Sequence, residues 1–187
     1  MPRGVLTREE VIDQLMEVFR RHGYDGASLT ELSKATGLGK SSLYHYFPGG
    51  KEEMGRAVLE RTRGWLDETG SASLDGEGTP EERLRRMLNA VNQFYAGGRK
   101  LCVLGNMALS GGRPLFQREL HDMFRLWIDG LAKLLVETGI PARDARIRAE
   151  DAVSEIQGTL IVSAGLDQPG PFQRLMKRLP DELMAKA

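Results

Sequence analysis

The segment spanning residues 28–47, SLTELSKATGLGKSSLYHYF, constrains the fold of this chain most, because it predicts two short helices joined by a tight turn. Ser28 is placed to cap the first helix with its hydroxyl, and Glu31 can bond back to the Ser28 amide, which completes a capping box. Gly37 can adopt the left-handed conformation that ends a helix, because glycine has no Cβ to clash. We therefore expect the first helix to end near Thr36.

The second predicted helix begins after Gly39 and ends at Pro48. Leu43 and Phe47 form its inward stripe, since they lie four residues apart. The side chains that project elsewhere are nearly all hydrogen-bonding types: Lys40, Ser41, Ser42, Tyr44, His45 and Tyr46. A helix of this size is about 10 Å long, short enough to put its N-terminal end into a major groove about 12 Å wide. The segment is therefore predicted to be a helix-turn-helix that binds DNA.

This segment resembles the helix-turn-helix of the TetR family of bacterial transcriptional regulators. The resemblance is carried by the run LYHYF at residues 43–47 followed by Lys51, and residues 11–24 are similar to the family's first helix. It implies a dimeric regulator in which a small molecule bound to a helical bundle pushes the DNA-reading helices off their half-site spacing. Beyond the first third of the chain, only the order of helices follows the family.

The predicted DNA-binding residues are the polar side chains around these two helices: Ser28, Thr30, Lys40, Ser41, Ser42, Tyr44, His45, Tyr46 and Lys51. Ser41, Ser42 and Tyr44 are expected to read base edges, because hydroxyls bond to them and a ring can meet a thymine methyl group. Lys40 can reach guanine or a phosphate, Thr30 supports from the preceding helix, and the others are expected to bind phosphates. The alternative is a helical hairpin that packs on another helix and never touches DNA.

Charge alone does not predict a nucleic-acid partner. The chain has 26 basic and 26 acidic residues, and through Lys51 the basic residues exceed the acidic ones by one. What favours DNA is placement, since Lys40 and Lys51 flank the second helix, whereas the acidic residues between positions 9 and 17 belong to another helix. We expect modest non-specific affinity that depends strongly on salt.

Every strong apolar pattern downstream is helical, so the chain is predicted to be all-α with about nine helices. Residues 1–50 are expected to form a three-helix DNA-binding domain. Residues 51–187 are expected to form a helical effector-binding and dimerisation domain.

Caps and breaks predict where the helices begin and end. Thr7 with Glu10, and Thr79 with Glu82, have the spacing of capping boxes, and Pro80 suits a first helical position. The other helices are predicted over residues 51–69, 101–109, 114–137, 142–164 and 172–184, the last interrupted near Pro180, with a loop at residues 70–78.

Aromatic, sulfur-containing and amide side chains fall on three successive helices that resemble the family's ligand-binding region: Phe94, Tyr95, Cys102, Asn106, Met107, Met123, Phe124 and Trp127. They are predicted to line a pocket for an unknown apolar or amphipathic effector, with plain core packing as the alternative. The run CVLGN at residues 102–106 resembles a subgroup of multidrug-type regulators, although Leu101 stands where a glycine is expected. Cys102 fits a small buried hydrophobe better than a thiol switch.

A single reader of this size makes few contacts, so recognition by this motif usually needs a dimer with half-sites about 34 to 36 Å apart. The apolar stripes of the last two predicted helices are candidates for a four-helix interface in a homodimer: Val153, Ile156, Gly158, Leu160, Phe172, Leu175 and Leu179. The alternative is an ordinary intramolecular core.

Other classes have little support in the sequence. The chain is predicted to be cytoplasmic for three reasons. It has a single cysteine, no apolar run approaches the roughly 18 residues that span a bilayer, and the N-terminus lacks the apolar core of a signal peptide. His22, His45 and His121 are not spaced as metal ligands or nucleophile–base pairs, so no metal, cofactor or catalytic residue is predicted. The favoured function is a ligand-responsive repressor released from a palindromic operator by a small molecule. Its competitors are a helical ligand- or partner-binding module without DNA binding and a cofactor-free helical enzyme.

Overall fold

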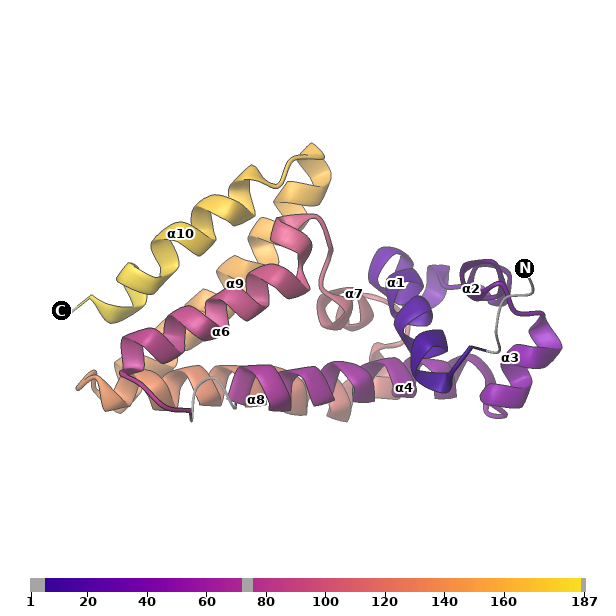
Figure 1. Ribbon diagram of the computed structural model, residues 1–187, viewed down its shortest axis with the longest axis horizontal. Helices are drawn as coiled ribbons and strands as arrows, with labels where there is room; N and C mark the ends of the chain where they lie inside the picture. Colours follow the sequence, from indigo (N-terminus) through magenta and orange to yellow (C-terminus); the bar gives the residue numbers. More distant parts are fainter. Residues whose placement is uncertain (1–5, 72–75, 186–187) are drawn as a thin grey trace. The chain divides into compact units, whose positions relative to one another are not determined.

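The part of the chain that the structure describes is predominantly helical. The computed structural model describes residues 6–71 and 76–185, and these contain nine α-helices and no strand (Figure 1). The elements are α1 (Arg8–Gly26), α2 (Leu29–Thr36), α3 (Lys40–Tyr46), α4 (Gly50–Trp65), the π-helix η1 (Leu66–Ser71), α6 (Pro80–Phe94), the 3-10 helix η2 (Ala96–Gly98), α7 (Val103–Leu109), α8 (Arg113–Glu137), α9 (Ala142–Leu166) and α10 (Gly170–Met184). The prediction of an all-α protein is confirmed.

The helices form two compact units. The first unit comprises the described residues up to Arg63 together with Val103–Leu120, and the second comprises Gly64–Cys102 and the described residues from His121 onward. The boundary predicted at residue 50 therefore differs from the division into compact units. Most of α4 stays with the first unit, and the chain returns to this unit with α7 and the start of α8.

Side-chain contacts explain why these later segments belong to the first unit. The guanidinium of Arg56 on α4 pairs with Glu119 on α8 and lies 5.5 Å above the ring centre of Phe116. Met107 of α7 and Phe116 of α8 are both fully buried. Such tertiary contacts are not visible in the local sequence pattern that suggested the boundary.

The core of the first unit is built from the apolar faces of short helices. In Figure 1, α2 and α3 follow α1, and α2 contacts both of its neighbours. The fully buried side chains include Val11, Leu15, Phe19, Leu32, Leu43, Phe47, Met54 and Val58. Burying these stripes fixes the face that each helix turns outward.

The predicted helix starts are confirmed at two capping boxes. In α1 the amide of Glu10 donates to Thr7 Oγ1 at 3.2 Å, and the amide of Thr7 donates to Glu10 Oε2 at 2.8 Å. Thr79 and Glu82 form the same pair of bonds at the start of α6, where Pro80 takes the first position. These local signals were sufficient to place both helices.

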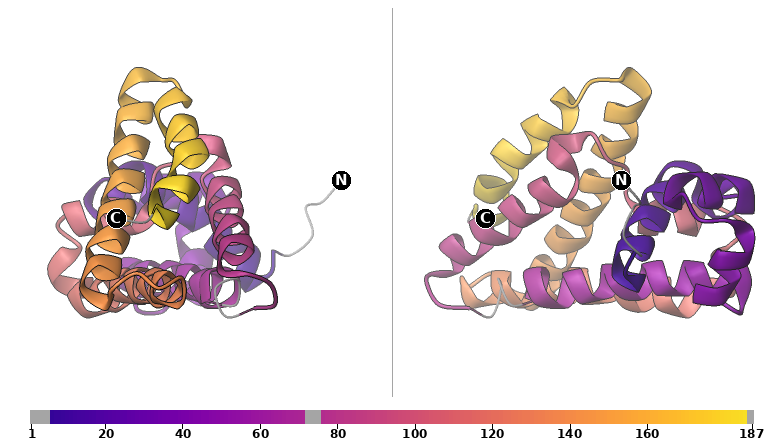
Figure 2. Two further views of the ribbon diagram at one scale, coloured as in Figure 1. Left: turned by 90° about the vertical axis from the view of Figure 1, so that its left-hand side faces the viewer. Right: turned by 45° about the vertical axis from the view of Figure 1, so that its right-hand side comes forward.

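In the second unit, α10 packs against α6 and α9 (Figure 2). The last helix was expected to be interrupted near Pro180, but α10 continues through this residue to Met184. Leu179, Pro180 and Leu183 are all buried, so packing on both sides of the proline holds the helix together despite the missing amide. Of the predicted loop, residues 76–78 form bends, residues 70 and 71 close η1, and residues 72–75 lie outside the described residues.

Candidate DNA-binding interface

A network of short hydrogen bonds sets the turn between α2 and α3. Gly37 has φ +67°, the left-handed conformation predicted for it, which a side chain would disfavour. Thr36 Oγ1 donates to the Leu32 carbonyl at 2.9 Å and accepts from the Leu38 amide at 3.3 Å. Ser33 Oγ donates to the Leu38 carbonyl at 2.5 Å. The turn is therefore bonded on both sides, and α3 leaves it in a defined direction.

The start of α2 differs from the prediction in one bond. Ser28 Oγ accepts from the Glu31 amide at 3.2 Å, as expected for a cap. The amide of Ser28 donates to the Gly26 carbonyl at 2.9 Å instead of to Glu31. The capping box is thus only half formed, because the preceding turn already uses this donor. Ser28 and Thr30 are both exposed.

The outward face of α3 carries most of the predicted DNA-binding residues. Leu43 and Phe47 are fully buried beneath it and anchor the helix to the first unit. The exposed residues of α3 are Lys40, Ser41, Tyr44 and His45, and Ser42 is half-buried. Tyr44 keeps 45% of its surface exposed although it is large and aromatic. This face therefore presents hydroxyl, phenol, imidazole and ammonium groups to solvent.

Two of the residues predicted to bind phosphate already have partners within the first unit. The Tyr46 hydroxyl donates to the Leu6 carbonyl at 2.8 Å. The Lys51 ammonium donates to the Asp25 carbonyl at 3.3 Å and lies 4.5 Å above the centre of the Tyr24 ring. Burial lowers the pKa of Lys51, and the negative charge of Asp25 opposes this shift. These bonds make Tyr46 and Lys51 less available to DNA than the exposed residues of α3.

The attachment of α7 to the end of α1 could not be predicted from local sequence patterns. Asn106 Nδ2 donates to the Arg20 carbonyl, and the Tyr24 amide donates to Ser110 Oγ at 3.1 Å. The amide of Gly111 donates to Asp25 Oδ2 at 2.6 Å. These bonds hold the segment that leads from α1 into the helix-turn-helix.

Gly23 makes this close approach possible, because its backbone is non-helical within α1. Its φ is +61°, and a Cβ at this position would lie 3.2 Å from Cβ of Ser110 and 3.3 Å from the Asn106 carbonyl oxygen. A side chain would therefore be strained by conformation and crowded by α7. Gly23 was the signal in the sequence, but nothing local identified α7 as its neighbour.

The predicted ligand-binding residues are divided between the two units. Asn106 and Met107 belong to the first unit, where Asn106 bonds to α1 and Met107 is fully buried. In the second unit, the Tyr95 hydroxyl donates to Cys102 Sγ at 3.2 Å, and both residues are buried. Met123 and Trp127 are also buried, while Phe124 is half-buried.

An aromatic partner of this set was missed. The ring of Trp65, at the end of α4, stacks on Phe94 with 3.9 Å between ring centres. Phe94 in turn meets Tyr95 edge to face, at 5.2 Å. A tryptophan in an otherwise charged helix was the available signal in the sequence.

Apart from Gly158, the residues predicted for the dimer interface are buried within a single chain. Val153, Ile156, Leu160, Phe172, Leu175 and Leu179 are at most 4% exposed within a single chain. Their stripes are already covered by the packing of α9, α10 and their neighbours, so these side chains belong to the intramolecular core. The opposite face of α9 carries the exposed apolar residues Ile161, Val162 and Leu166, which are 55, 50 and 57% exposed.

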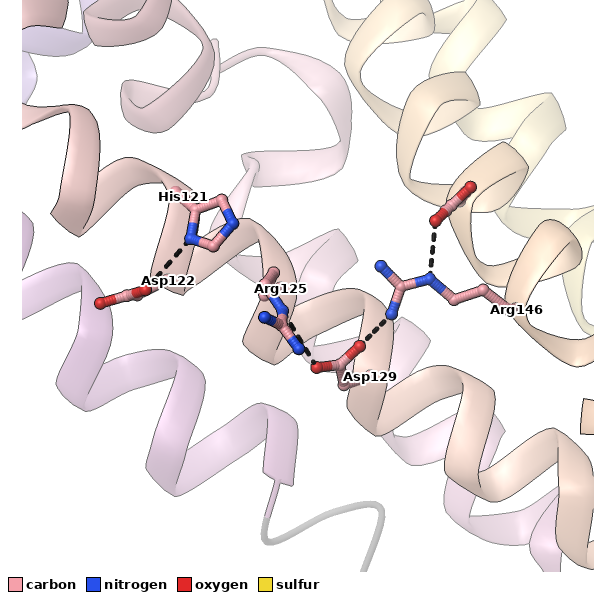
Figure 3. A network of polar contacts seen from close by, with 6 residues as sticks. His121, Asp122, Arg125, Asp129 and Arg146 are labelled. Carbon is pink, nitrogen blue, oxygen red and sulfur yellow. Dashed lines mark hydrogen bonds and ion pairs between the residues drawn. The ribbon is translucent and has the colours of Figure 1, made fainter.

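Charged side chains on the surface of the second unit form ion pairs with one another. His121 Nδ1 lies 3.2 Å from the carboxylate of Asp122. Figure 3 shows Asp129 between Arg125 and Arg146. Arg146 also pairs with Glu150 at 2.6 Å. These exposed ion pairs link α8 to α9 and resemble ordinary surface bridges. Within residues 6–71 and 76–185, no group of His, Cys, Asp and Glu side chains is arranged to hold a metal ion.

A helix-turn-helix with an exposed polar second helix, followed by a helical bundle, defines the class of helix-turn-helix transcriptional regulators. Residues 11–58 match the sequence profile of the bacterial regulatory proteins of the tetR family. Residues 80–178 match the profile of the C-terminal domain of LmrA/YxaF-like transcriptional regulators. The chain therefore belongs to the TetR family of DNA-binding transcriptional regulators.

Individual relatives are similar along nearly the whole chain. The HTH-type transcriptional regulator LmrA of Bacillus subtilis is 22% identical over 95% of this chain and 96% of its own length. The HTH-type transcriptional repressor DhaR of a Mycobacterium species is 27% identical over 82% of this chain and 80% of its own. One similar solved structure is that of a cysteine mutant of the TetR-family regulator CifR in complex with 26-bp double-strand operator DNA. Its TM-score is 0.72 at 22% sequence identity, and the match covers 97% of this chain and 98% of that chain. None of the described helices is both long and apolar enough to cross a membrane.

Proposed function

We propose that this regulator is a repressor that binds a palindromic operator as a homodimer and is released when a small molecule binds its helical bundle. The observation that carries the proposal is the outward face of α3, which stays exposed while Leu43 and Phe47 are fully buried beneath it. The similarity of this chain to the transcriptional repressor DhaR and to CifR, which was solved in complex with operator DNA, supports the proposal. The protein acts in the cytoplasm, where its DNA is accessible.

The residues of α3 and α2 contact different parts of the DNA. Ser41, Ser42 and Tyr44 read base edges in the major groove, and Lys40 contacts guanine or an adjacent phosphate. His45, together with Ser28 and Thr30 at the start of α2, binds the phosphate backbone. Tyr46 and Lys51 can contact a phosphate only by giving up their hydrogen bonds to the carbonyls of Leu6 and Asp25. Their main role is therefore to hold α3 and the start of α4 in place.

The dimer forms through the exposed face of α9. Gly158 and Gly165 have open space where a side chain would be, and Ile161, Val162 and Leu166 lie on the same exposed side of the helix. An apolar surface of this kind is stabilised when a second copy covers it. Arg178 of α10, which pairs with Glu155 of α9, supplies polar contacts at its edge.

The effector binds in the second unit, beside the stacked rings of Trp65 and Phe94 and the Tyr95–Cys102 pair. An apolar or amphipathic molecule suits these side chains. The chain enters α7 at Val103, directly after Cys102, so a displaced Cys102 pulls on the bonds between α7 and α1. A change at this attachment reorients the DNA-reading helices of each subunit and lowers operator affinity.

The experiment that tests this proposal is selection of bound fragments from a pool of genomic and random DNA. We expect an inverted repeat whose half-sites are separated by about one helical turn or a multiple of it. Sedimentation of the free protein at micromolar concentration is expected to show a dimer. Failure to enrich any sequence at low salt would favour a helical ligand- or partner-binding module without DNA binding, and turnover of a bound small molecule would favour an enzyme.

A further inference from the structure

A groove lies between α6 and α10 in the second unit. Its volume is about 540 Å³, which is within the range of small-molecule sites in proteins. Figure 2 shows the two helices running beside each other, and both contribute to the lining. None of the predicted ligand-binding or dimer-interface residues lines this groove.

Unused hydrogen-bonding groups are the main feature of the lining. Asn89 and Asn92 enter the groove from α6, and Gln173 enters it from α10. Within the described part of the chain, the side chains of these residues make no hydrogen bond to other protein groups. Each amide offers an N–H₂ donor and a carbonyl acceptor, so the groove can bond to a ligand from both of its walls.

One positive charge in the groove is free to meet a ligand. Arg85 donates to Glu81 Oε1 at 3.0 and 3.1 Å and to Asp181 Oδ1 at 3.0 Å, so two carboxylates already neutralise it. Lys177 lines the same groove, is exposed, and has no ion pair among the residues that the structure describes. A ligand with one negative charge is therefore favoured, because its charge would meet the ammonium of Lys177.

The remaining wall is apolar. Leu88 is 3% exposed, Pro180 is buried, and Met176 is half-buried beside them. Hydrocarbon or aromatic groups can cover these side chains while polar groups of the same molecule bond to the amides. The combination of an apolar wall, several amides and one free cation is that of a site for a small, functionalised molecule.

We propose that the groove between α6 and α10 binds a small organic carboxylate that carries an amide, or a similar hydrogen-bonding group, on an apolar body. The carboxylate pairs with Lys177, the polar group bonds to Asn89, Asn92 and Gln173, and the body covers Leu88 and Met176. This site is separate from the effector site proposed above. Binding here does not depend on whether the chain recognises DNA.

The probe for this site is para-acetamidobenzoate, with the neutral para-acetamidobenzamide, which has nearly the same shape, as its uncharged control. Titration of each into the full chain, followed by calorimetry and by amide NMR shifts, is expected to show tighter binding of the carboxylate and shifts confined to α6, η2 and α10. Equal affinity for the two compounds would overturn the assignment of an anion. No binding of either at millimolar concentration would overturn the site.

Substitutions then locate the bound molecule. Lys177→Gln is expected to weaken para-acetamidobenzoate by about fivefold, the upper end for an exposed ion pair, and to leave the neutral compound unaffected. Lys133→Gln, an exposed lysine on α8 outside the groove, is the matched control and is expected to change neither affinity. Equal losses in the two variants would overturn the role of Lys177. DNA selection with the Lys177 variant separates this result from a failure of the proposed function.

Discussion

The backbone amide of Tyr24 donates a 3.1 Å hydrogen bond to the hydroxyl of Ser110, and that hydroxyl donates in turn to the Met107 carbonyl at 3.0 Å. A single side chain on the segment after α7 thus joins the end of α1 to the end of α7. The Asn106 amide adds a bond to the Arg20 carbonyl one turn earlier in α1. The DNA-reading segment is therefore held from a part of the chain far away in sequence.

Ser110→Ala is expected to lower the free energy of unfolding by about 1 kcal/mol, because it leaves the half-buried Tyr24 amide without a partner. Chemical denaturation measures this change. Ser154→Ala is the control, since Ser154 is exposed on α9 and donates only to the Glu150 carbonyl of its own helix. The same loss in both variants would show that the bond to Tyr24 contributes nothing particular.

Tyr44→Ala is expected to change sequence preference and to leave the fold intact, because 45% of this side chain is exposed on α3. Losing a base contact costs about 1–3 kcal/mol at the position that it reads. Selection from a DNA pool with the wild-type chain and the variant measures the change. His45→Ala, which removes an exposed neighbour proposed to bind phosphate, is expected to weaken all sequences alike. A uniform loss for Tyr44→Ala would contradict its role as a base reader.

The sequence was sufficient where the structure depends on neighbours along the chain. The capping pairs Thr7–Glu10 and Thr79–Glu82, the left-handed turn at Gly37 and the buried stripe of α3 are all set within a few residues. Local bonding and helical periodicity determine them, and the exposed face of α3 follows from the stripe.

The sequence was insufficient where the structure depends on distant contacts. An apolar stripe such as that of Val153, Ile156 and Leu160 must be covered, but periodicity does not tell whether its own chain or a second copy covers it. The attachment of Ser110 to Tyr24 and the internal partners of Lys51 likewise join segments that only the folded chain brings together.

Lys51 is expected to lose its proton below the ordinary lysine value of 10.5, because burial lowers its pKa. Between this lowered pKa and 10.5 the unfolded chain binds more protons than the folded chain, so the Lys51 contribution to stability rises with pH. The pKa of the Tyr24 phenol is raised, chiefly by burial and then by Glu52 and Asp25, and the Tyr24 contribution to stability falls as pH passes 10.0.

A Tyr24→Phe background therefore isolates the effect of Lys51 on the pH dependence of stability. There, denaturation at rising pH up to the ordinary lysine value of 10.5 is expected to give a less positive slope once Lys51→Met is added. An unchanged slope would mean that the Lys51 ammonium is as well solvated in the folded chain as in the unfolded one.

The exposed face of α9 and its buried face are expected to respond differently to substitution at adjacent positions. Ile161 is 55% exposed and Leu160 is 1% exposed, so Ile161→Glu places a charge on the proposed dimer surface while Leu160→Ala opens a cavity in the core. Leu160→Ala is expected to cost about 2–5 kcal/mol of folding free energy.

Ile161→Glu is expected to keep the helical circular dichroism of the wild-type chain and to sediment as a monomer, because two carboxylates facing each other across a symmetric interface repel. The monomer should also lose affinity for an inverted repeat much more than for a single half-site. If Ile161→Glu remains a dimer at micromolar concentration, the subunits meet through some other surface, and the half-site spacing must be derived from that surface instead.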